Sequence, residues 1–504
     1  MTKLCSWKAI FLLCVFCAAT AIASRAQTLT TLANFNYTNG DMPWGMNLIQ
    51  GTDGNFYGTT YEGGTYGMGT VFKVAPEGVL TTLYSFCAQT GCPDGNGPYG
   101  GLVQASDGNF YGITSLGGAY NDGTVFKITP EGTLTRLHSF NGADGISPSS
   151  PLIQASNGNF YGTTCWGGGS NACNGPGCGT VFEITADGKL TTLHVFNGTD
   201  GQLVDAALVQ ATDGNFYGTT AEGGVDDCSP YPGCGTVFEM NRSGNLTTLY
   251  TFHGSDGWMP KAGLVQATNG NFYGTTAWGG ASNNGTVFEI TPEGELTTLY
   301  TFNFTGGGFP TAALIQATDG NLYGTTTAGG LYGWSANPPY GSGYGTLFEI
   351  TPEGELTTLH DFDMTDGDGP WGGLVQGTDG NLYGTTGMGG NGPNCGWGGC
   401  GTVFSLSVGL DPFVKAEPGS GEAGAAVMIL GTNLTGASRV TFNGAAAEFT
   451  VVSSSEIRAT VPGGASSGKV EVATPHGVLS SNVPFQVVLQ PVRHSPPFHP
   501  RPVS

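Results

Sequence analysis

The chain has 504 residues, of which 88 are glycine and only 10% are charged, and its formal net charge is −22. Glycine does not recur at every third position, which excludes collagen, and 39% hydrophobic residues exclude a chain too polar to fold. The acidic charge also argues against nucleic acid as a partner, because phosphates would be repelled. Abundant glycine in a chain that can still build a core predicts many tight turns.

Residues 1–26 are predicted to be an export signal. Two lysines precede an apolar run of 15 residues (9–23), which is too short to span a bilayer comfortably. Small residues at 24–26 suit cleavage after residue 26, with 21–23 as a second option. No later segment reaches about 18 consecutive apolar residues. We therefore expect no transmembrane segment and a location that is periplasmic, at the cell surface or secreted.

Export places the cysteines in an oxidising compartment and so predicts disulfides. Of the 12 cysteines, three lie in the signal and eight of the other nine form close pairs. Zinc is the rival interpretation, but the spacings are not C-x-x-C and no histidine is clustered nearby. A disulfide that closes so small a loop adds about 2 kcal/mol of stability in the chain-entropy picture. The predicted pairs are Cys87/Cys92, Cys173/Cys178, Cys228/Cys234 and Cys395/Cys400, and Cys165 is left as a buried thiol.

Internal repeats fill most of the chain. The phrases LxQxxxGNxYGxT, GT[VL]F and LT[TR]L each occur seven times, 50–60 residues apart. Such a fixed period is the signature of a repeat architecture. The seven copies can therefore be compared with one another position by position.

Each repeat is predicted to form four short strands. In one copy, runs rich in Val, Thr, Tyr and Phe lie at 264–267, 272–276, 285–290 and 296–302. Asn-Gly-Asn joins the first two runs and Thr-Pro-Glu-Gly the last two, and both are turn sequences. Seven such units predict a seven-bladed β-propeller over residues 27–409. A parallel β-helix is the structural rival, but its rungs are shorter and more regular.

The order of the phrases predicts how the ring closes. The repeats open with a fourth-type strand (29–35) and end with a third-type strand (401–406). The opening strand can therefore complete the last blade, which removes an exposed sheet edge.

The phrases GNFYGTT, GTVFEI and PEGELTTLYTF resemble the GloVer tandem repeat of "choice-of-anchor" bacterial surface proteins, and the resemblance covers residues 29–407. It implies an exported protein that is anchored by a C-terminal module. It implies no defined enzymatic activity.

A second domain is expected over residues 410–488, where the repeats stop. Alternating strands with turn signals about every 8–12 residues predict an immunoglobulin-like β-sandwich. VMILGTNL (427–434) and VTFNG (440–444) resemble an IPT/TIG domain, which implies a spacer or binding module. The expected fold class is therefore all-β: a seven-bladed β-propeller followed by an immunoglobulin-like β-sandwich. Residues 489–504 carry five prolines and are predicted to be a disordered tail.

One face of the expected propeller carries every tryptophan that follows the signal. The connections between the second and third strands, and between blades, emerge there and are long and variable. Aromatic rings on a variable loop face suit ligand recognition, such as stacking on sugars or gripping a protein. The alternative is packing between blades, which we favour for the recurring Pro-[Trp/Tyr]-Gly position. The candidate ligand-binding residues are Trp44, Tyr99, Trp166, Trp258, Trp278, Trp334, Trp371 and Trp397.

Acids and histidines recur on the same face without forming a recognisable catalytic motif. The acids Asp94, Asp144, Asp200, Asp256 and Asp366 mostly precede glycine, which is ordinary turn chemistry, although calcium binding is a weaker alternative. His138, His194 and His360 share one repeat position with tyrosines, which favours a structural role. We predict no catalytic residue, no metal ligand and no cofactor.

The sequence favours an exported, non-enzymatic binding or surface-structure protein, expected to be a monomer. Its expected partner is a glycan or an extracellular protein. The alternative is a propeller enzyme acting on polysaccharide, a lyase or hydrolase with carboxylates at the mouth of the central channel, which rests on analogy between folds.

Overall fold

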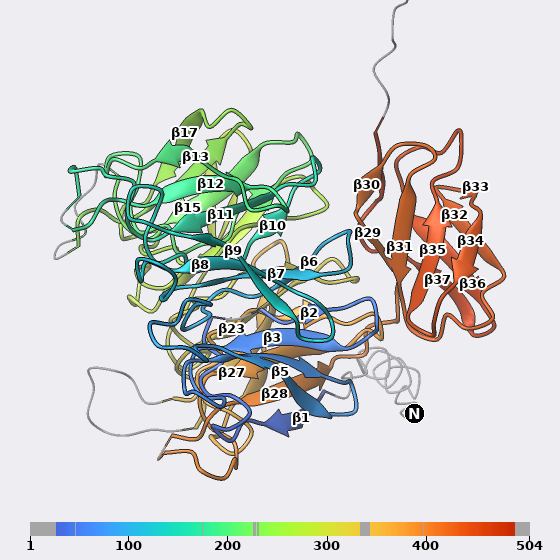
Figure 1. Cartoon of the computed structure of the whole chain (residues 1–504), viewed down its shortest axis with the longest axis horizontal. Coiled ribbons are helices and arrows are strands. Elements are labelled where there is room, and N and C mark those ends of the chain that lie inside the picture. The colour runs from blue at the N-terminus through green and yellow to red at the C-terminus, as the bar shows by residue number, and fades with distance from the viewer. Residues whose placement is uncertain are drawn as a thin grey trace, which may run out of the picture.

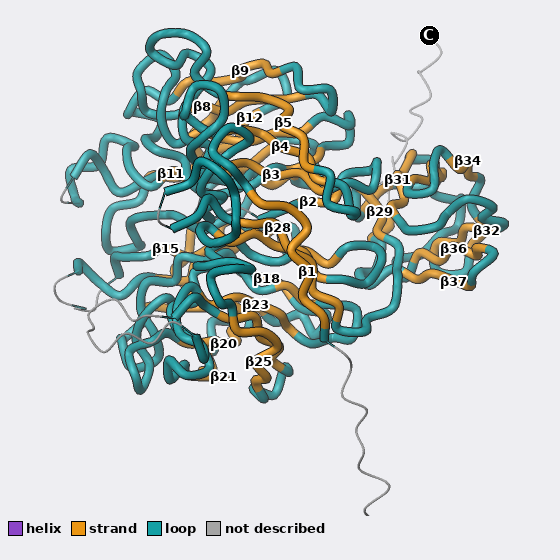
Figure 2. Tube along the Cα trace, turned by 90° about the horizontal axis from the view of Figure 1, so that it is seen from below, coloured by secondary structure: helices purple, strands orange, loops and turns teal. Residues whose placement is uncertain are grey.

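The computed structural model describes residues 27–45, 47–173, 175–224, 228, 231–332, 343–396 and 398–488. These residues form strands and connections without any helix, and hence without a helix able to cross a membrane (Figures 1 and 2). The predicted signal (1–26) and the predicted tail (489–504) lie outside the described residues.

Seven four-stranded antiparallel sheets form the blades of a propeller, which confirms the predicted fold class. The short first strands, nearest the axis, are β2 (Ile49–Gln50), β6 (Val103–Gln104), β10 (Ile153–Gln154), β14 (Val209–Gln210), β18 (Val265–Gln266), β22 (Ile315–Gln316) and β26 (Val375–Gln376). The second strands are β3 (Phe56–Thr60), β7 (Phe110–Thr114), β11 (Phe160–Thr164), β15 (Phe216–Thr220), β19 (Phe272–Thr276), β23 (Leu322–Thr326) and β27 (Leu382–Thr386). The third strands are β4 (Thr70–Val74), β8 (Thr124–Ile128), β12 (Thr180–Ile184), β16 (Thr236–Met240), β20 (Thr286–Ile290), β24 (Thr346–Ile350) and β28 (Thr402–Ser407). The outer strands are β5 (Leu80–Ser85), β9 (Leu134–Ser139), β13 (Leu190–Val195), β17 (Leu246–Thr251), β21 (Leu296–Thr301), β25 (Leu356–Asp361) and β1 (Thr28–Asn34).

Blades 1 to 6 each consist of four consecutive strands, and blade 7 is completed by the start of the chain. Strand β1 pairs antiparallel with β28, with Thr28 opposite Ser407 and Asn34 opposite Thr402. Blade 7 thus contains both ends of the repeat region, as the order of the phrases predicts. This pairing leaves no unpaired third strand at the junction.

Adjacent blades pack through buried aromatic rings of their second strands. Tyr57 stacks on Phe110 of the next blade with ring centroids 4.1 Å apart, and Tyr383 of blade 7 stacks on Phe56 of blade 1 at 3.9 Å. The glycine that follows each tyrosine makes room for a ring of the same blade. A Cβ atom at Gly58 would lie 2.7 Å from the Phe72 ring.

Residues after the propeller form a β-sandwich around its own apolar core. One sheet contains β29 (Lys415–Glu417), β31 (Ala426–Leu430), β35 (Glu456–Thr460) and β34 (Phe449–Val451). The other contains β33 (Ala445–Ala446), β32 (Arg439–Phe442), β36 (Val470–Thr474) and β37 (Gly477–Ser480). A parallel pair, β30 (Ser420–Gly421) and β38 (Gln486–Val487), lies beside them.

The sandwich lies against one face of the propeller, here called the turn face, which carries the short turns between first and second strands. Thr432 Oγ1 lies 2.9 Å from Thr378 Oγ1, and the Ser455 hydroxyl donates a hydrogen bond to the Thr52 carbonyl at 3.1 Å. Figures 1 and 2 show the long connections on the opposite side, here called the loop face. The sandwich therefore leaves the loop face uncovered.

Candidate functional site

A repeated backbone feature shapes the centre of the loop face. In every connection between blades, one residue has a φ angle between 53° and 58°, in the left-handed region. Five of the seven residues are not glycine, so their side chains make this conformation costly, at about 1–3 kcal/mol each. They are Met42, Gly97, Ser147, Leu203, Met259, Phe309 and Gly369.

The carbonyl of each left-handed residue accepts a hydrogen bond from the N–H that follows the second strand of the same blade. In blade 1, for example, Tyr61 N–H donates to the Met42 carbonyl at 3.0 Å, and in blade 3 Cys165 N–H donates to the Ser147 carbonyl at 3.2 Å. This bond fixes the path of the next two residues. The second of them forms what we call the mouth ring: Trp44, Tyr99, Ser149, Asp205, Lys261, Thr311 and Trp371.

The mouth ring surrounds a central cavity of about 510 Å³ on the loop face. All seven of its members line the cavity, together with Tyr61 and Cys165 from the ends of second strands. The lining also includes small residues, among them Ala207, Gly263 and Ala313. A concave site of this volume is in the range that holds small ligands.

One half of the cavity wall is aromatic. Trp44 stacks on Tyr61 with centroids 6.2 Å apart and meets Trp371 edge to face at 4.9 Å, while Tyr61 meets Tyr99 at 5.9 Å. Gly387 of blade 7 makes the tryptophan pair possible, because a Cβ there would lie 2.3 Å from Trp44 and 2.7 Å from Trp371. The rings at the Pro-[Trp/Tyr]-Gly position therefore do both things that the sequence left open. Trp44 and Trp371 pack against each other between blades 1 and 7, and together with Tyr99 they line the cavity.

The other half of the wall is polar. The Cys165 thiol donates a hydrogen bond to Asp205 Oδ1 at 2.6 Å, and the Ser149 hydroxyl donates to the same oxygen at 3.2 Å. Burial, reinforced by the Asp205 charge, raises the pKa of the Cys165 thiol well above its usual value, so the group stays a protonated donor. Cys165 is the buried free thiol that the sequence predicts.

Lys261 carries the positive charge of this polar half. Its ammonium makes no hydrogen bond or ion pair with any residue that the structure describes. Two further polar atoms of the wall, Trp44 Nε1 and Thr311 Oγ1, are buried with no partner in the described part of the chain. Lys261 is partly exposed, so its ammonium is available to a ligand, and a buried polar atom without a partner, such as Trp44 Nε1 or Thr311 Oγ1, is uncommon in proteins.

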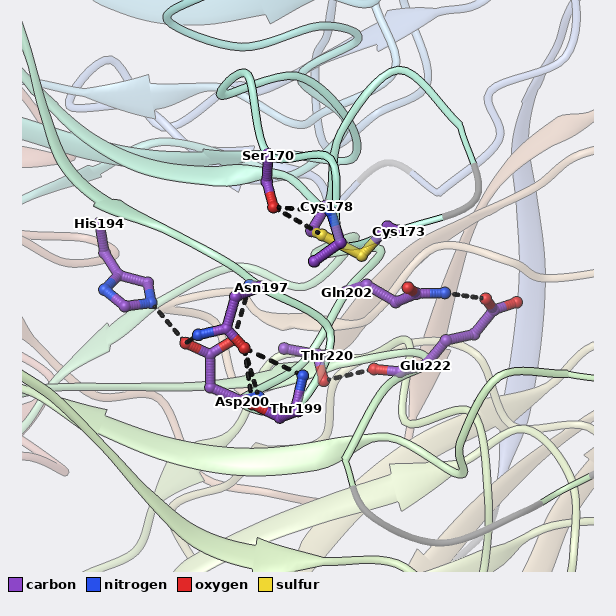
Figure 3. Close-up of a disulfide and its surroundings, with 11 residues drawn as sticks. Ser170, Cys173, Cys178, His194, Asn197, Thr199, Asp200, Gln202, Thr220 and Glu222 are labelled. Atoms are coloured by element: carbon purple, nitrogen blue, oxygen red, sulfur yellow. Dashed lines mark hydrogen bonds and ion pairs between the residues drawn. A yellow bond between two sulfur atoms is a disulfide. The ribbon is translucent and has the colours of Figure 1, made fainter.

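The recurring aspartates of the loop face, unlike the polar groups of the cavity that lack a partner among the described residues, form hydrogen bonds to other side chains of the protein. Each carboxylate bonds a histidine or tyrosine of the outer strand at 2.5–3.0 Å (Figure 3 shows His194 and Asp200). The pairs are Tyr84–Asp94, His138–Asp144, His194–Asp200, Tyr250–Asp256 and His360–Asp366. Among the described residues there is no group of three or more His, Cys, Asp or Glu placed to hold a metal ion.

Four disulfides staple the connections of the loop face, and they join the cysteines that the spacing pairs: Cys87–Cys92, Cys173–Cys178, Cys228–Cys234 and Cys395–Cys400. Figure 3 shows the bond between Cys173 and Cys178 in the connection of blade 3.

The remaining candidate tryptophans that the structure describes are not among the residues that line the cavity. Trp166 forms an isolated backbone bridge with Ile146, and Trp258 forms one with Trp278. Trp334 and Trp397 lie outside the described residues.

Sequence reasoning missed part of the site. Tyr61, Cys165, Asp205 and Lys261 were absent from the candidates, although comparison of the seven copies carries a signal for two of them. Asp205 and Lys261 occupy the same repeat position as Trp44.

The fold and the cavity define a β-propeller with a central site on one face and an immunoglobulin-like domain on the other. The model of the Gloeobacter/Verrucomicrobia repeat family matches residues 18–175, 144–337 and 229–411, and the chain belongs to this family. The IPT/TIG domain matches residues 414–487. Tandem repeats joined to such a domain fit a surface or binding protein.

Several solved structures are similar to this chain. A fungal alcohol oxidase of the AA5 family, in complex with copper, is similar with a TM-score of 0.50 and 12% identity, over 92% of this chain and 99% of that chain. The periplasmic gluconolactonase of Pseudomonas aeruginosa gives 0.43 and 17%, over 70% and 99%. A gluconolactonase of Xanthomonas campestris gives 0.35 and 14%, over 62% and 90%. At these identities the likeness concerns the fold alone. No curated protein matches the chain.

Proposed function

We propose that the protein is an exported binding protein that holds a carbohydrate in the central cavity of its loop face. The observation that carries the proposal is the division of the cavity wall into an aromatic half and a polar half. Trp44, Tyr61, Tyr99 and Trp371 supply the first.

A sugar ring has the matching division of surface. Its C–H face is apolar and suits the flat side of an indole or phenol ring, while its hydroxyl groups both donate and accept hydrogen bonds. The Asp205 carboxylate can accept from hydroxyl groups, and the Lys261 ammonium can donate to them. The bond from the Cys165 thiol holds the Asp205 side chain in place.

The domain arrangement supports the same proposal. The sandwich contacts the turn face through Thr432 and Ser455, so the cavity on the loop face stays open to large ligands. Disulfides among the described residues are consistent with an extracellular location. In this arrangement the sandwich serves as the spacer that holds the propeller by its other side.

An enzyme acting on polysaccharide is the second candidate, because one carboxylate, that of Asp205, lies on the cavity wall. Glycoside hydrolysis by the usual route needs a pair of carboxylates that flank the scissile bond. Asp205 is the only acidic residue among the described residues that line the cavity. We therefore favour binding without turnover.

A glycan array probed with the exported chain tests the proposal. We expect retention of a small set of related glycans, released by the free sugar and recovered unchanged. Binding to no glycan would overturn the proposal, and release of shortened products would favour the enzyme.

A further inference from the structure

A second group of aromatic side chains, here called the rim group, lies on the loop face beside the polar half of the cavity. Trp278 lies 4.3 Å from Phe309 and 6.1 Å from Trp258, measured between ring centroids. Trp258 also meets Tyr231 at 5.0 Å, and Phe304 meets Phe309 at 5.9 Å. These five rings come from four connections around blades 4, 5 and 6.

The rim group remains partly accessible. None of its five members is fully buried, and Tyr231 is 38% exposed. The Trp258 indole N–H donates to Asn283 Oδ1 at 3.2 Å, so the orientation of this ring is fixed. The group is therefore a partly exposed aromatic surface, in which Trp258 also packs against the core between blades 4 and 5.

Chain connectivity places the rim group next to the cavity. Phe309 precedes Thr311 of the mouth ring by two residues, and Trp258 precedes Lys261 by three. Phe309 itself is one of the left-handed residues that position the mouth ring. The polar half of the wall thus lies between two aromatic surfaces.

The fold does not require the rim tryptophans. All seven blades form the same isolated backbone bridge at the position that Trp258 and Trp278 occupy in blade 5. Blade 6 makes it with Gly308 and Ala328, and blade 7 with Asp368 and Met388. Aromatic residues on both sides of this bridge are thus a feature of blade 5 and not of the propeller.

We propose that the rim group is a second subsite for the same ligand, so that the protein binds a chain of several sugar units and not a single sugar. This inference rests on the proposed function. One unit occupies the cavity, the chain passes over Lys261 and Thr311, and later units stack on Trp278 and its neighbours. The ligand class is accordingly a linear polysaccharide.

The test is calorimetry with oligosaccharides of increasing length, from disaccharide to hexasaccharide, prepared from β-1,4-glucan, xylan and galacturonan. For the polysaccharide that binds, we expect affinity to rise with length by about tenfold, which is about the contribution of one stacked ring. Trp278→Ala should remove this rise and leave disaccharide binding unchanged. Trp166→Ala is the matched control, because Trp166 holds the equivalent position in blade 3 and lies outside the rim group.

Three results separate the possible failures. If affinity still rises with oligosaccharide length in Trp278→Ala, the second subsite is overturned and the cavity proposal remains intact. The same conclusion follows if the affinity of the unaltered chain does not rise with length. Binding of no oligosaccharide by the unaltered chain overturns both proposals. Trp278→Phe keeps an aromatic ring and should retain most of the rise in affinity with length. The melting temperature of Trp278→Ala shows whether that variant is folded, so that a loss of binding caused by misfolding is recognised.

Discussion

Gln50 of blade 1 accepts, at Oε1, a hydrogen bond from the backbone N–H of Thr378 of blade 7, at 2.9 Å. The same bond joins every pair of neighbouring blades. Its partners are Thr52–Gln104, Ser106–Gln154, Ser156–Gln210, Thr212–Gln266, Thr268–Gln316, Thr318–Gln376 and Thr378–Gln50. A closed ring of glutamines therefore links the blades near the turn face, independently of the pairing between β1 and β28.

Gln50→Ala is expected to destabilise the propeller by about 1–3 kcal/mol, because it leaves the N–H of the buried residue Thr378 unpaired. Gln154→Ala is the matched control. Its partner Ser106 is exposed, so water can replace the lost bond and the loss should be smaller. Urea unfolding of both variants measures the difference. Equal losses would contradict the importance of burial at this junction.

Asp368→Asn is expected to stabilise the protein at neutral pH. Burial raises the pKa of Asp368 from its ordinary value of 3.8 to about 6. Between these two values the folded chain binds more protons than the unfolded chain, so stability falls as pH rises through this window and stays lower above it. The variant avoids this loss.

Melting temperatures of Asp368→Asn and the unaltered chain should thus differ near pH 7 and converge below the ordinary pKa of 3.8. A constant difference at all pH values would show that the charge of Asp368 is not the cause.

The energetic cost of the left-handed backbone conformation that precedes the mouth ring can be tested by one substitution that removes it and one that adds it. Ser147→Gly should stabilise by about 1 kcal/mol, because glycine adopts a positive φ without steric cost. Gly369→Ala should destabilise by about the same amount through backbone strain alone, since its added Cβ would meet nothing closer than 3.6 Å. Thermal unfolding checks both. A loss of stability in Ser147→Gly would contradict the strain.

Cys165 should resist alkylation in the folded protein. Only the thiolate reacts quickly, and burial together with the Asp205 charge raises the pKa of this thiol. Mass spectrometry of the chain from residue 27, which lacks the three cysteines of the predicted signal, is expected after iodoacetamide treatment to find the native protein unmodified and the denatured, unreduced protein modified once. Rapid labelling of the native chain would contradict the hydrogen-bonded thiol, and several labels on the denatured chain would contradict the disulfides.

The sequence predicts the blades well because local chemistry defines them. An Asp-Gly or Asn-Gly turn joins the first two strands of every blade, and a turn that ends in glycine, most often Pro-Glu-Gly, joins the last two strands of blades 1 to 6. The displaced opening strand predicts the pairing of β1 with β28. Cysteine spacing likewise predicts the disulfides, because each pair closes a short loop.

The cavity is harder to predict because it depends on distance from the propeller axis. Trp44 and Trp166 are both loop-face tryptophans, yet only Trp44 lies two residues after a left-handed turn and lines the cavity. Lys261 and Asp205 escape notice because their residue types differ from the aromatic pattern. Both residues hold the same repeat position as Trp44. This becomes informative only when the structure shows that the seven connections bring this position to the central cavity.

The most direct test of the account is calorimetric titration of the best glycan from the array into the unaltered chain, Trp44→Ala and Trp166→Ala. Loss of the Trp44 ring should weaken binding by about tenfold or more, because the ring forms part of the cavity wall. Trp166→Ala should bind as the unaltered chain does. Equal affinity of all three proteins would contradict the assignment of the ligand to the central cavity.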